Sequence, residues 1–245
     1  MAKGTEVIAI VPARCGSKGI KDKNLKELKG HSLLEWSIKS ATKSKEIDRV
    51  FVSTDSESYG EIAKSLGAEV PFLRPKEISG DKSSDIEFLT HFLSEAPKLK
   101  INPSLIIHLR PTSPTRFPDI LDNAINVFKN SSKYTSLRSI HEMSESAYKT
   151  FEITTDELLL TTFEKKSDIE SSNKARQSFP KTYFANGYID IIRPELITQY
   201  NLMHGNQVLG FKTDPIIEVD TLYDFNLLEA FLEVPVNKKY LEIFC

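Results

Sequence analysis

The segment IAIVPARCGSKGIKDKN, residues 8–24, places chemically active side chains directly after a run of apolar residues. It contains four cations and two glycines, namely Arg14, Lys18, Lys21, Lys23, Gly16 and Gly19. Backbone N–H groups in a glycine-containing loop can surround an anion, and nearby Lys and Arg add charge-assisted hydrogen bonds to phosphate. The loop is therefore predicted to hold a polyphosphate. From charge alone, a solvated surface loop rich in lysine is the alternative.

Two common phosphate-binding motifs do not describe this loop. A Walker A loop needs Gly-Lys followed by Ser or Thr, whereas the order here is Gly16-Ser17-Lys18-Gly19. The dinucleotide motif G-x-G-x-x-G is also absent. The sequence thus predicts a phosphate-binding loop that belongs to neither class.

Composition excludes several classes of protein. The chain has 245 residues, of which 27% are charged, and a net charge of -2, so no overall field favours nucleic acid or a membrane surface. No run approaches about 20 apolar residues, so no membrane span is expected, and the opening MAKGTEVIAIVPA does not resemble a secretory signal. Two cysteines, Cys15 and Cys245, favour a reducing compartment, and we expect a cytoplasmic protein.

The elements that must position the loop follow an α/β order. Strands are expected over 6–13, 49–54 and 104–109, and helices over 32–44, 56–68, 85–97 and 118–130. This alternation predicts a mostly parallel central sheet with helices on both faces. Ligands of such sheets bind at the carboxyl ends of the strands. The opening loop, STDS at 53–56 and RPTSPTR at 110–116 all follow expected strands, so they should lie at one edge.

The pattern changes between about residues 134 and 181, where short stretches are typical of β-hairpins. We interpret 1–245 as a single domain in which 140–175 form an inserted, β-rich lobe. The α/β pattern then returns with strands over 187–192 and 207–213 and a last helix over 221–233.

Longer motifs extend the interpretation. VPARCGSKGIKDKNLKELKGHSLLEWSI resembles the opening of the acylneuraminate cytidylyltransferases, which include enzymes that make CMP-legionaminic acid. The resemblance continues in VSTDSE, LRPKEISGDKSSD, RPTSPTR, RQSFPKTYFANGYIDI and IEVDTLYDF, and is weakest between about 140 and 175. It implies a Rossmann-like nucleotidyltransferase fold with a small dimerisation lobe, Mg2+ as cofactor, and a homodimer. The implied reaction joins CTP and a nine-carbon 2-keto sugar acid into a CMP-sugar, with release of pyrophosphate.

The resemblance assigns a nucleotide site. Arg14 and Lys18 would hold the triphosphate and act catalytically, because fixed cations stabilise the negative charge that moves onto the leaving pyrophosphate. The remaining implied nucleotide-binding residues are Ala13, Gly16, Ser17, Asn24, Arg74 and Ser84. Asn24 and Arg74 match positions that line the base. Asp85 is the alternative to Ser84.

The resemblance also assigns a metal site to IEVDTLYDF, with Asp220 as a catalytic metal ligand and Glu218 as its partner. Carboxylates one residue apart along a strand point to the same side, so both could face one Mg2+. Glu218 stands where the family has Asp, which leaves its direct ligation open. The alternative role for Asp220 is the N-cap of the last helix.

The implied acceptor-sugar site comprises Arg110, Thr112, Ser113, Arg176, Gln177, Asn186 and Gly187. Arg110 replaces the family's Gln, and a guanidinium brings a permanent charge and donors only. We therefore expect Arg110 to face the sugar and N-acetylneuraminic acid not to be the best substrate. The alternative is that Arg110 pairs with a nearby carboxylate and never reaches the sugar.

Three other functions compete with this one. A Kdo cytidylyltransferase shares fold and chemistry, but its opening usually lacks Gly-Ser-Lys-Gly. A glycosyltransferase would normally carry Asp-x-Asp at the end of a central strand, and SLIIHLRPTS has none. A non-catalytic nucleotide-binding protein would keep the loop, but would not need Asp220.

Overall fold

A computed structural model describes residues 5–163, 165–167 and 169–245. The chain forms two compact units. The larger one runs to Ser139 and also contains Asn186–Phe211 and Ile216–Cys245, and the smaller one consists of Ile140–Ala185 and Lys212–Pro215.

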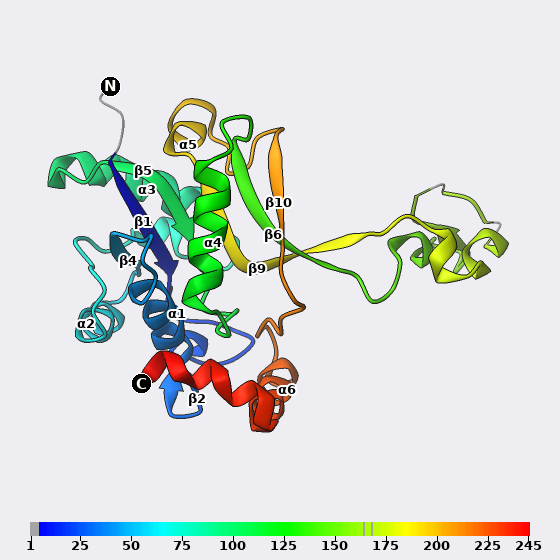
Figure 1. Cartoon of the computed structure of the whole chain (residues 1–245), viewed down its shortest axis with the longest axis horizontal. Coiled ribbons are helices and arrows are strands. Elements are labelled where there is room, and N and C mark those ends of the chain that lie inside the picture. Colours follow the sequence, from blue (N-terminus) through cyan, green and yellow to red (C-terminus); the bar gives the residue numbers. More distant parts are fainter. Residues whose placement is uncertain (1–4, 164, 168) are drawn as a thin grey trace. The chain divides into compact units, whose positions relative to one another are not determined.

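A six-stranded sheet forms the centre of the larger unit, in the order β10-β6-β9-β5-β1-β4 (Figure 1). Its strands are β1 (Glu6–Pro12), β4 (Arg49–Ser53), β5 (Pro103–His108), β6 (Ser136–Glu142), β9 (Tyr183–Ile192) and β10 (Val208–Lys212). Strand β1 pairs in parallel with both β4 and β5, and β5 pairs antiparallel with β9. The prediction of an α/β protein with a mostly parallel central sheet is confirmed.

Both faces of the sheet are covered by helices, as expected from the unbroken apolar pattern of β1 (Figure 1). Val7, Ala9 and Val11 pack against α1 (Leu33–Thr42), α2 (Glu57–Ser65) and α4 (Pro118–Lys129). Ile8 and Ile10 point the other way and pack against α3 (Asp85–Glu95) and α5 (Pro194–Tyr200). The side-chain period of two thus builds a core on each side of one strand.

A third apolar cluster fixes the C-terminal segment. Helix α6 (Leu222–Glu233) and the 3-10 helix Pro235–Phe244 pack on Trp36 of α1 and on the short hairpin of β2 (Glu27–Leu28) and β3 (His31–Ser32). The hairpin follows the opening loop and a 3-10 turn at Lys23–Leu25. The packing therefore holds the far end of the opening loop close to the start of α6.

Local capping explains most helix boundaries. Ser32 caps α1 by accepting a hydrogen bond from the Glu35 N–H, and Pro118 occupies the first turn of α4, as predicted. The last motif differs from its interpretation in two respects. Glu218 and Asp220 do not lie along a strand, and the alternative role given to Asp220 is wrong, because the N-cap of α6 is Thr221, whose side chain accepts from the Asp224 N–H.

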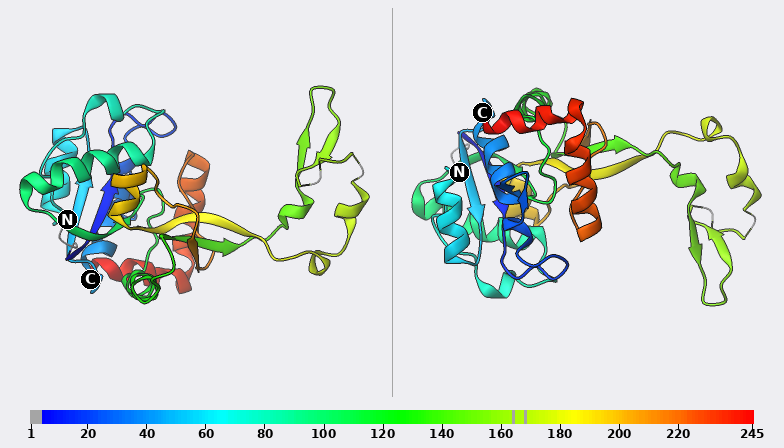
Figure 2. Two further views of the ribbon diagram at one scale, coloured as in Figure 1. Left: turned by 90° about the horizontal axis from the view of Figure 1, so that it is seen from above. Right: turned by 90° about the horizontal axis from the view of Figure 1, so that it is seen from below.

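The smaller unit contains a two-stranded hairpin of β7 (Phe151–Ile153) and β8 (Leu159–Thr161), visible in Figure 2. Short 3-10 turns accompany it at Ala147–Lys149, Glu170–Asn173 and Arg176–Ser178. Large apolar side chains are exposed here, among them Ile153 at 71% and Phe163 at 57%. Within the described part of the chain, no helix is long and apolar enough to cross a membrane.

Candidate active site

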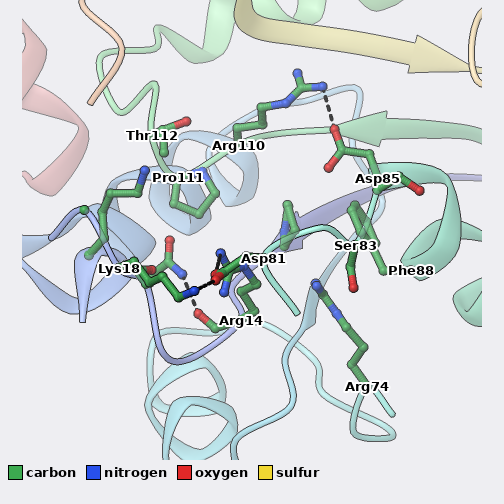
Figure 3. A pocket seen from close by; sticks show the side chains of 16 residues that line it. Arg14, Lys18, Arg74, Asp81, Ser83, Asp85, Phe88, Arg110, Pro111 and Thr112 are labelled. Atoms are coloured by element: carbon green, nitrogen blue, oxygen red, sulfur yellow. Dashed lines mark hydrogen bonds and ion pairs between the residues drawn. The ribbon is translucent and has the colours of Figure 1, made fainter. Parts of the chain in front are cut away.

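A cavity of about 320 Å³ opens beside the carboxyl ends of β1 and β5 in the larger unit (Figure 3). Three segments contribute most of its walls. They supply Arg14, Ser17, Lys18, Lys23 and Asn24 after β1; Asp81, Ser83, Ser84 and Asp85 before and at the start of α3; and Arg110, Pro111 and Thr112 after β5. The loop after β4, residues 53–56, was also expected at this edge. It does not line the cavity but supports the opening loop.

The opening loop is fixed by hydrogen bonds to that supporting loop. The Ala13 N–H donates to the Ser53 carbonyl at 2.9 Å, and the Cys15 N–H donates to Asp55 Oδ1 at 2.8 Å. Gly16 has φ of +73°, a backbone conformation that favours glycine. Ala13 is fully buried and, like Gly16, is absent from the cavity wall. Both therefore shape the loop, while Arg14, Ser17 and Lys18 line the cavity.

The two predicted triphosphate cations share one carboxylate. Arg14 Nη2 lies 3.0 Å from Asp81 Oδ1, and Lys18 Nζ lies 2.5 Å from Asp81 Oδ2 (Figure 3). These cations, Lys18 first, lower the pKa of Asp81. Asp81 thus occupies the position that an anionic ligand of both cations would take. Asp81 lies in the motif LRPKEISGDKSSD, but no role was predicted for it from the sequence.

The two predicted base-lining residues are buried and held in place. The Asn24 side-chain amide donates to the Arg14 carbonyl at 2.9 Å, which couples it to the opening loop. Arg74 donates to both the side chain and the carbonyl of Ser53, and its guanidinium lies over the Phe88 ring. Burial lowers the pKa of Arg74 to about 10, so it still carries its charge at neutral pH. Both reach the cavity with little freedom to move.

Ser84 and Asp85 both line the cavity, so the two alternatives for that position lie side by side. Ser84 is the N-cap of α3, and its N–H donates to the Glu87 carboxylate. Asp85 is the first residue of the helix and accepts a hydrogen bond from Arg110 Nη2 at 2.8 Å.

Of the two expectations for Arg110, the pairing with a carboxylate is confirmed, and the contact with the sugar stays a prediction. Arg110 lines the cavity, and it also pairs with Asp85 and with Asp190 Oδ2, each at 2.8 Å (Figure 3 shows the Asp85 pair). Pairing with a carboxylate and facing a ligand are therefore compatible. From the sequence, Asp190 was predicted only to lie in a strand. The feature that could have indicated a function is an ionisable residue within the apolar run GYIDII.

Another residue missed from sequence, Arg116, joins the loop after β5 to β9. It is fully buried and donates to the carbonyls of Tyr188, Gly187 and Arg110 at 2.6 to 2.8 Å and to Ser37 Oγ at 3.1 Å. Burial lowers its pKa to about 9. The final Arg of RPTSPTR is thus the residue that holds this cavity wall in shape.

Gly187 lies where three segments meet. A Cβ atom there would come within 2.3 Å of Ser113 Oγ and 3.0 Å of Glu218 Oε2, and the Gly187 N–H donates to Glu218 Oε1 at 2.8 Å. Only glycine fits this approach without displacement of a neighbour. The structure therefore brings Ser113, Gly187 and Glu218 together, with the buried Asn186 next in the chain.

The proposed metal carboxylates have different partners. The Asp220 side chain is 76% exposed and lies 3.2 Å from Lys23 Nζ, whereas Glu218 accepts from Gly187. The described residues hold no group of three or more His, Cys, Asp or Glu suited to a metal ion. Carboxylate oxygens nevertheless suit Mg2+, which proteins often bind through one or two carboxylates together with substrate phosphates. The donor chemistry at Asp220 fits that kind of site.

Arg176 and Gln177 lie in the smaller unit, in the 3-10 turn Arg176–Ser178. Arg176 donates to the Met143 carbonyl at 2.9 Å, and both residues line a separate hollow with Phe179 and Lys181. Their predicted contact with the sugar stays a prediction.

Comparison with known proteins decides the family. The sequence pattern of a family described as Cytidylyltransferase matches residues 8–236. The chain belongs to the cytidylyltransferase family. The resemblance read from the motifs is thereby confirmed at the level of the family.

Relatives of the chain carry related names. The chain is 32% identical over 225 residues to an N-acylneuraminate cytidylyltransferase of Escherichia coli, covering 91% of this chain and 51% of that one. It is 32% identical over 127 residues to a CMP-N,N'-diacetyllegionaminic acid synthase of Legionella pneumophila, and this match covers 52% of this chain and 55% of that one. The chain thus spans about half the length of these two relatives.

A solved structure confirms the nucleotidyltransferase fold. A CMP:2-keto-3-deoxy-manno-octonic acid synthetase, in complex with CTP, superposes with a TM-score of 0.70 over 94% of this chain and 99% of that one. Sequence identity is 14%, so this similarity concerns the fold.

Proposed function

We propose that this protein transfers the cytidylyl group of CTP to a nine-carbon 2-keto sugar acid of the sialic-acid type, with release of pyrophosphate. One observation carries the proposal. A single cavity joins the cations Arg14 and Lys18 with the base-lining candidates Asn24 and Arg74 and, on the opposite wall, with Arg110. The names of the E. coli and Legionella relatives support this chemistry.

The reaction follows from the groups around the cavity. Arg14 and Lys18 would leave Asp81 and bind the β- and γ-phosphates. The anomeric hydroxyl of the sugar attacks the α-phosphorus in line and loses its proton to water, a P–O bond forms to the sugar, and the bond to the β-phosphate oxygen breaks. Negative charge grows on the leaving pyrophosphate, and preorganised cations stabilise that charge more than they stabilise bound CTP.

Base recognition is assigned to the two buried residues. The Asn24 side chain uses one N–H on the Arg14 carbonyl, which leaves its carbonyl oxygen and other N–H for the cytosine edge. A wrong base would leave such a buried group without its partner, at a cost of about 1–3 kcal/mol. We therefore expect CTP to be preferred over UTP by about tenfold or more.

The proposed cofactor is Mg2+, held by Asp220, with Glu218, which accepts from the Gly187 N–H, as the proposed second carboxylate. When bound, the ion stabilises charge on phosphoryl oxygens as a Lewis acid. Binding of an ion at Asp220 would weaken its pairing with Lys23, and it would free Lys23 for the nucleotide, because Lys23 also lines the cavity.

We further propose a homodimer formed through about residues 140–175. The segment exposes the large apolar side chains of Ile153, Leu158 and Phe163, and an interface with a second copy of the chain would bury them. The proposed location is the cytoplasm, which agrees with the free thiols of Cys15 and Cys245.

The test incubates the purified protein with CTP, Mg2+ and a panel of nonulosonic acids and Kdo, and follows CMP-sugar and pyrophosphate separately. We expect a CMP-sugar with at least one nonulosonic acid and a much slower reaction with Kdo or with UTP. Turnover of Kdo alone would identify the Kdo cytidylyltransferase alternative. CTP binding without any product would identify a non-catalytic nucleotide-binding protein.

A further inference from the structure

A fully buried carboxylate lies behind the cavity wall. Asp190 is on β9, directly opposite His108 of β5 in the sheet, and both residues have no exposed surface. A carboxylate loses its hydration when it is buried, and well-packed apolar residues in its place are generally at least as stabilising. The stability of the fold therefore gives no reason for Asp190, and a charged group beside a cavity is more typical of functional sites.

The hydrogen-bonding counterion of Asp190 is Arg110. Arg110 Nη1 lies 2.8 Å from Asp190 Oδ2. His108 Nδ1 is 3.8 Å away from the same oxygen, and burial lowers the pKa of His108 to about 4, so it is neutral at pH 7. Arg138 Nε is 3.7 Å from Oδ1, which has no hydrogen-bond partner in the described part of the chain.

Two carboxylates thus fix the Arg110 guanidinium from two sides. Nη1 is bound to the buried Asp190, and Nη2 is bound to Asp85 on the cavity wall. Since Asp190 lies in a sheet strand and Asp85 begins a helix, neither can easily follow a moving arginine. The guanidinium plane is therefore set by the fold before any ligand arrives, and its other N–H groups have a fixed direction.

The pairing also changes what Arg110 offers to a ligand. The two carboxylates offset its positive charge, so it faces the cavity as an oriented donor and not as a free cation. Asp85 lines the same wall and is an acceptor. Arg110 and Asp85 together present a donor beside an acceptor, which is the combination that a neutral side-chain amide provides. Such a pair suits a neutral polar substituent, such as a hydroxyl or an acylamino group, better than a further anion.

We propose that Asp190 is a positioning residue that fixes Arg110, so that the Arg110–Asp85 pair selects the acceptor sugar by one of its neutral polar substituents. This inference rests on the proposed cytidylyl transfer to a sugar acid. It assigns a specificity function to Asp85 and Asp190, and it predicts that Asp190 acts only through Arg110.

The test measures kcat/KM for N-acetylneuraminic acid and for a legionaminic acid, together with the KM for CTP. The proteins are the natural one, Asp190→Asn, Arg110→Gln and the double variant. We expect the ratio of the two sugars to change by about tenfold in each single variant, as when a buried polar partner is lost. The double variant should show no further change, because coupled residues are not additive. The KM for CTP should stay close to the natural value.

A matched control is Asp122→Asn, which removes a carboxylate that accepts from the Lys45 N–H and does not line the cavity. It should leave the sugar ratio unchanged. If Asp190→Asn does not fold, as judged by its thermal transition, Asp85→Asn tests the same pair from its more exposed side.

Three results overturn the inference while the proposed function stands. They are an unchanged sugar ratio in a folded Asp190→Asn or Asp85→Asn, an Asp190→Asn effect that persists in full beside Arg110→Gln, and a change confined to the KM for CTP. A natural protein that forms no CMP-sugar with any acceptor overturns the proposed function and the inference with it.

Discussion

Arg116→Lys is the perturbation whose cost can be worked out most directly from the structure. The guanidinium reaches four acceptors at once, the carbonyls of Tyr188, Gly187 and Arg110 and the hydroxyl of Ser37. A lysine keeps the charge but has one nitrogen with three donors, and it lacks the planar fork. We expect it to leave at least two of these acceptors without a partner.

A buried acceptor without a partner costs about 1–3 kcal/mol, so two of them cost about 2–6 kcal/mol. For a protein of this size, 1 kcal/mol shifts Tm by roughly 2–4 °C, and the variant should therefore melt at least about 4 °C lower. Turnover should also fall at temperatures where the variant is folded, because Arg116 holds the cavity wall that carries Arg110.

The assay combines a thermal melt with steady-state CMP-sugar formation. Arg193→Lys is the matched control, since Arg193 makes one hydrogen bond within the described residues, of 3.3 Å to the Tyr134 carbonyl, and otherwise lies over the Phe128 ring, which a lysine can also contact. Its Tm should change little. If Arg116→Lys melts and turns over like the natural protein, the hydrogen bonds of Arg116 do not hold the cavity wall.

The other predictions concern the ligands and the assembly. Lys18→Ala should lower turnover by at least ~100-fold with an unchanged Tm, as when other electrostatic donors are removed from a site where charge develops. A near-normal rate would show that the opening loop is a surface loop without a catalytic role. Asp81→Asn should lower the KM for CTP by roughly two- to tenfold, since two exposed ion pairs no longer compete with the triphosphate, and a raised KM would show that Asp81 assists binding. Asp220→Asn should nearly abolish activity, with little rescue by added Mg2+, whereas Glu218→Gln should lower activity less. The reverse order of severity would show that Glu218, and not Asp220, is the primary metal ligand. Light scattering should find a dimer that becomes monomeric when Ile153 and Phe163 are replaced by Asp, and an active, dilute monomer of the natural protein would contradict the proposed interface.

Local patterns account for the parts of this protein that could be predicted from sequence. The apolar run before Arg14, the cap at Ser32 and Pro118 each act within a few residues, so strands and helices could be placed. The rule that ligands bind at the carboxyl ends of parallel strands then put the opening loop and RPTSPTR at one edge, where the cavity lies.

Long-range pairing could not be read in the same way. Asp190 and Arg110 are 80 positions apart, and Arg116 and Tyr188 are 72 apart, so no local pattern records that they meet. The last motif failed for a related reason. Tertiary contacts, such as the hydrogen bond from the Val219 N–H to the Thr112 carbonyl, hold 213–219 in an irregular conformation. The cap at Thr221 is instead a local capping box with Asp224, so the spacing of TLYD already records it.

The sequence by itself determined the α/β class, the cation-rich, glycine-containing opening loop and the family motifs, because propensity, capping and charge are carried by neighbouring residues. Only the tertiary structure decided that Asp81 bridges the two cations and that Arg110 is held by Asp85 and Asp190. Those contacts depend on which loops meet at the edge of the sheet and on which groups burial forces to pair, and both are properties of the folded chain.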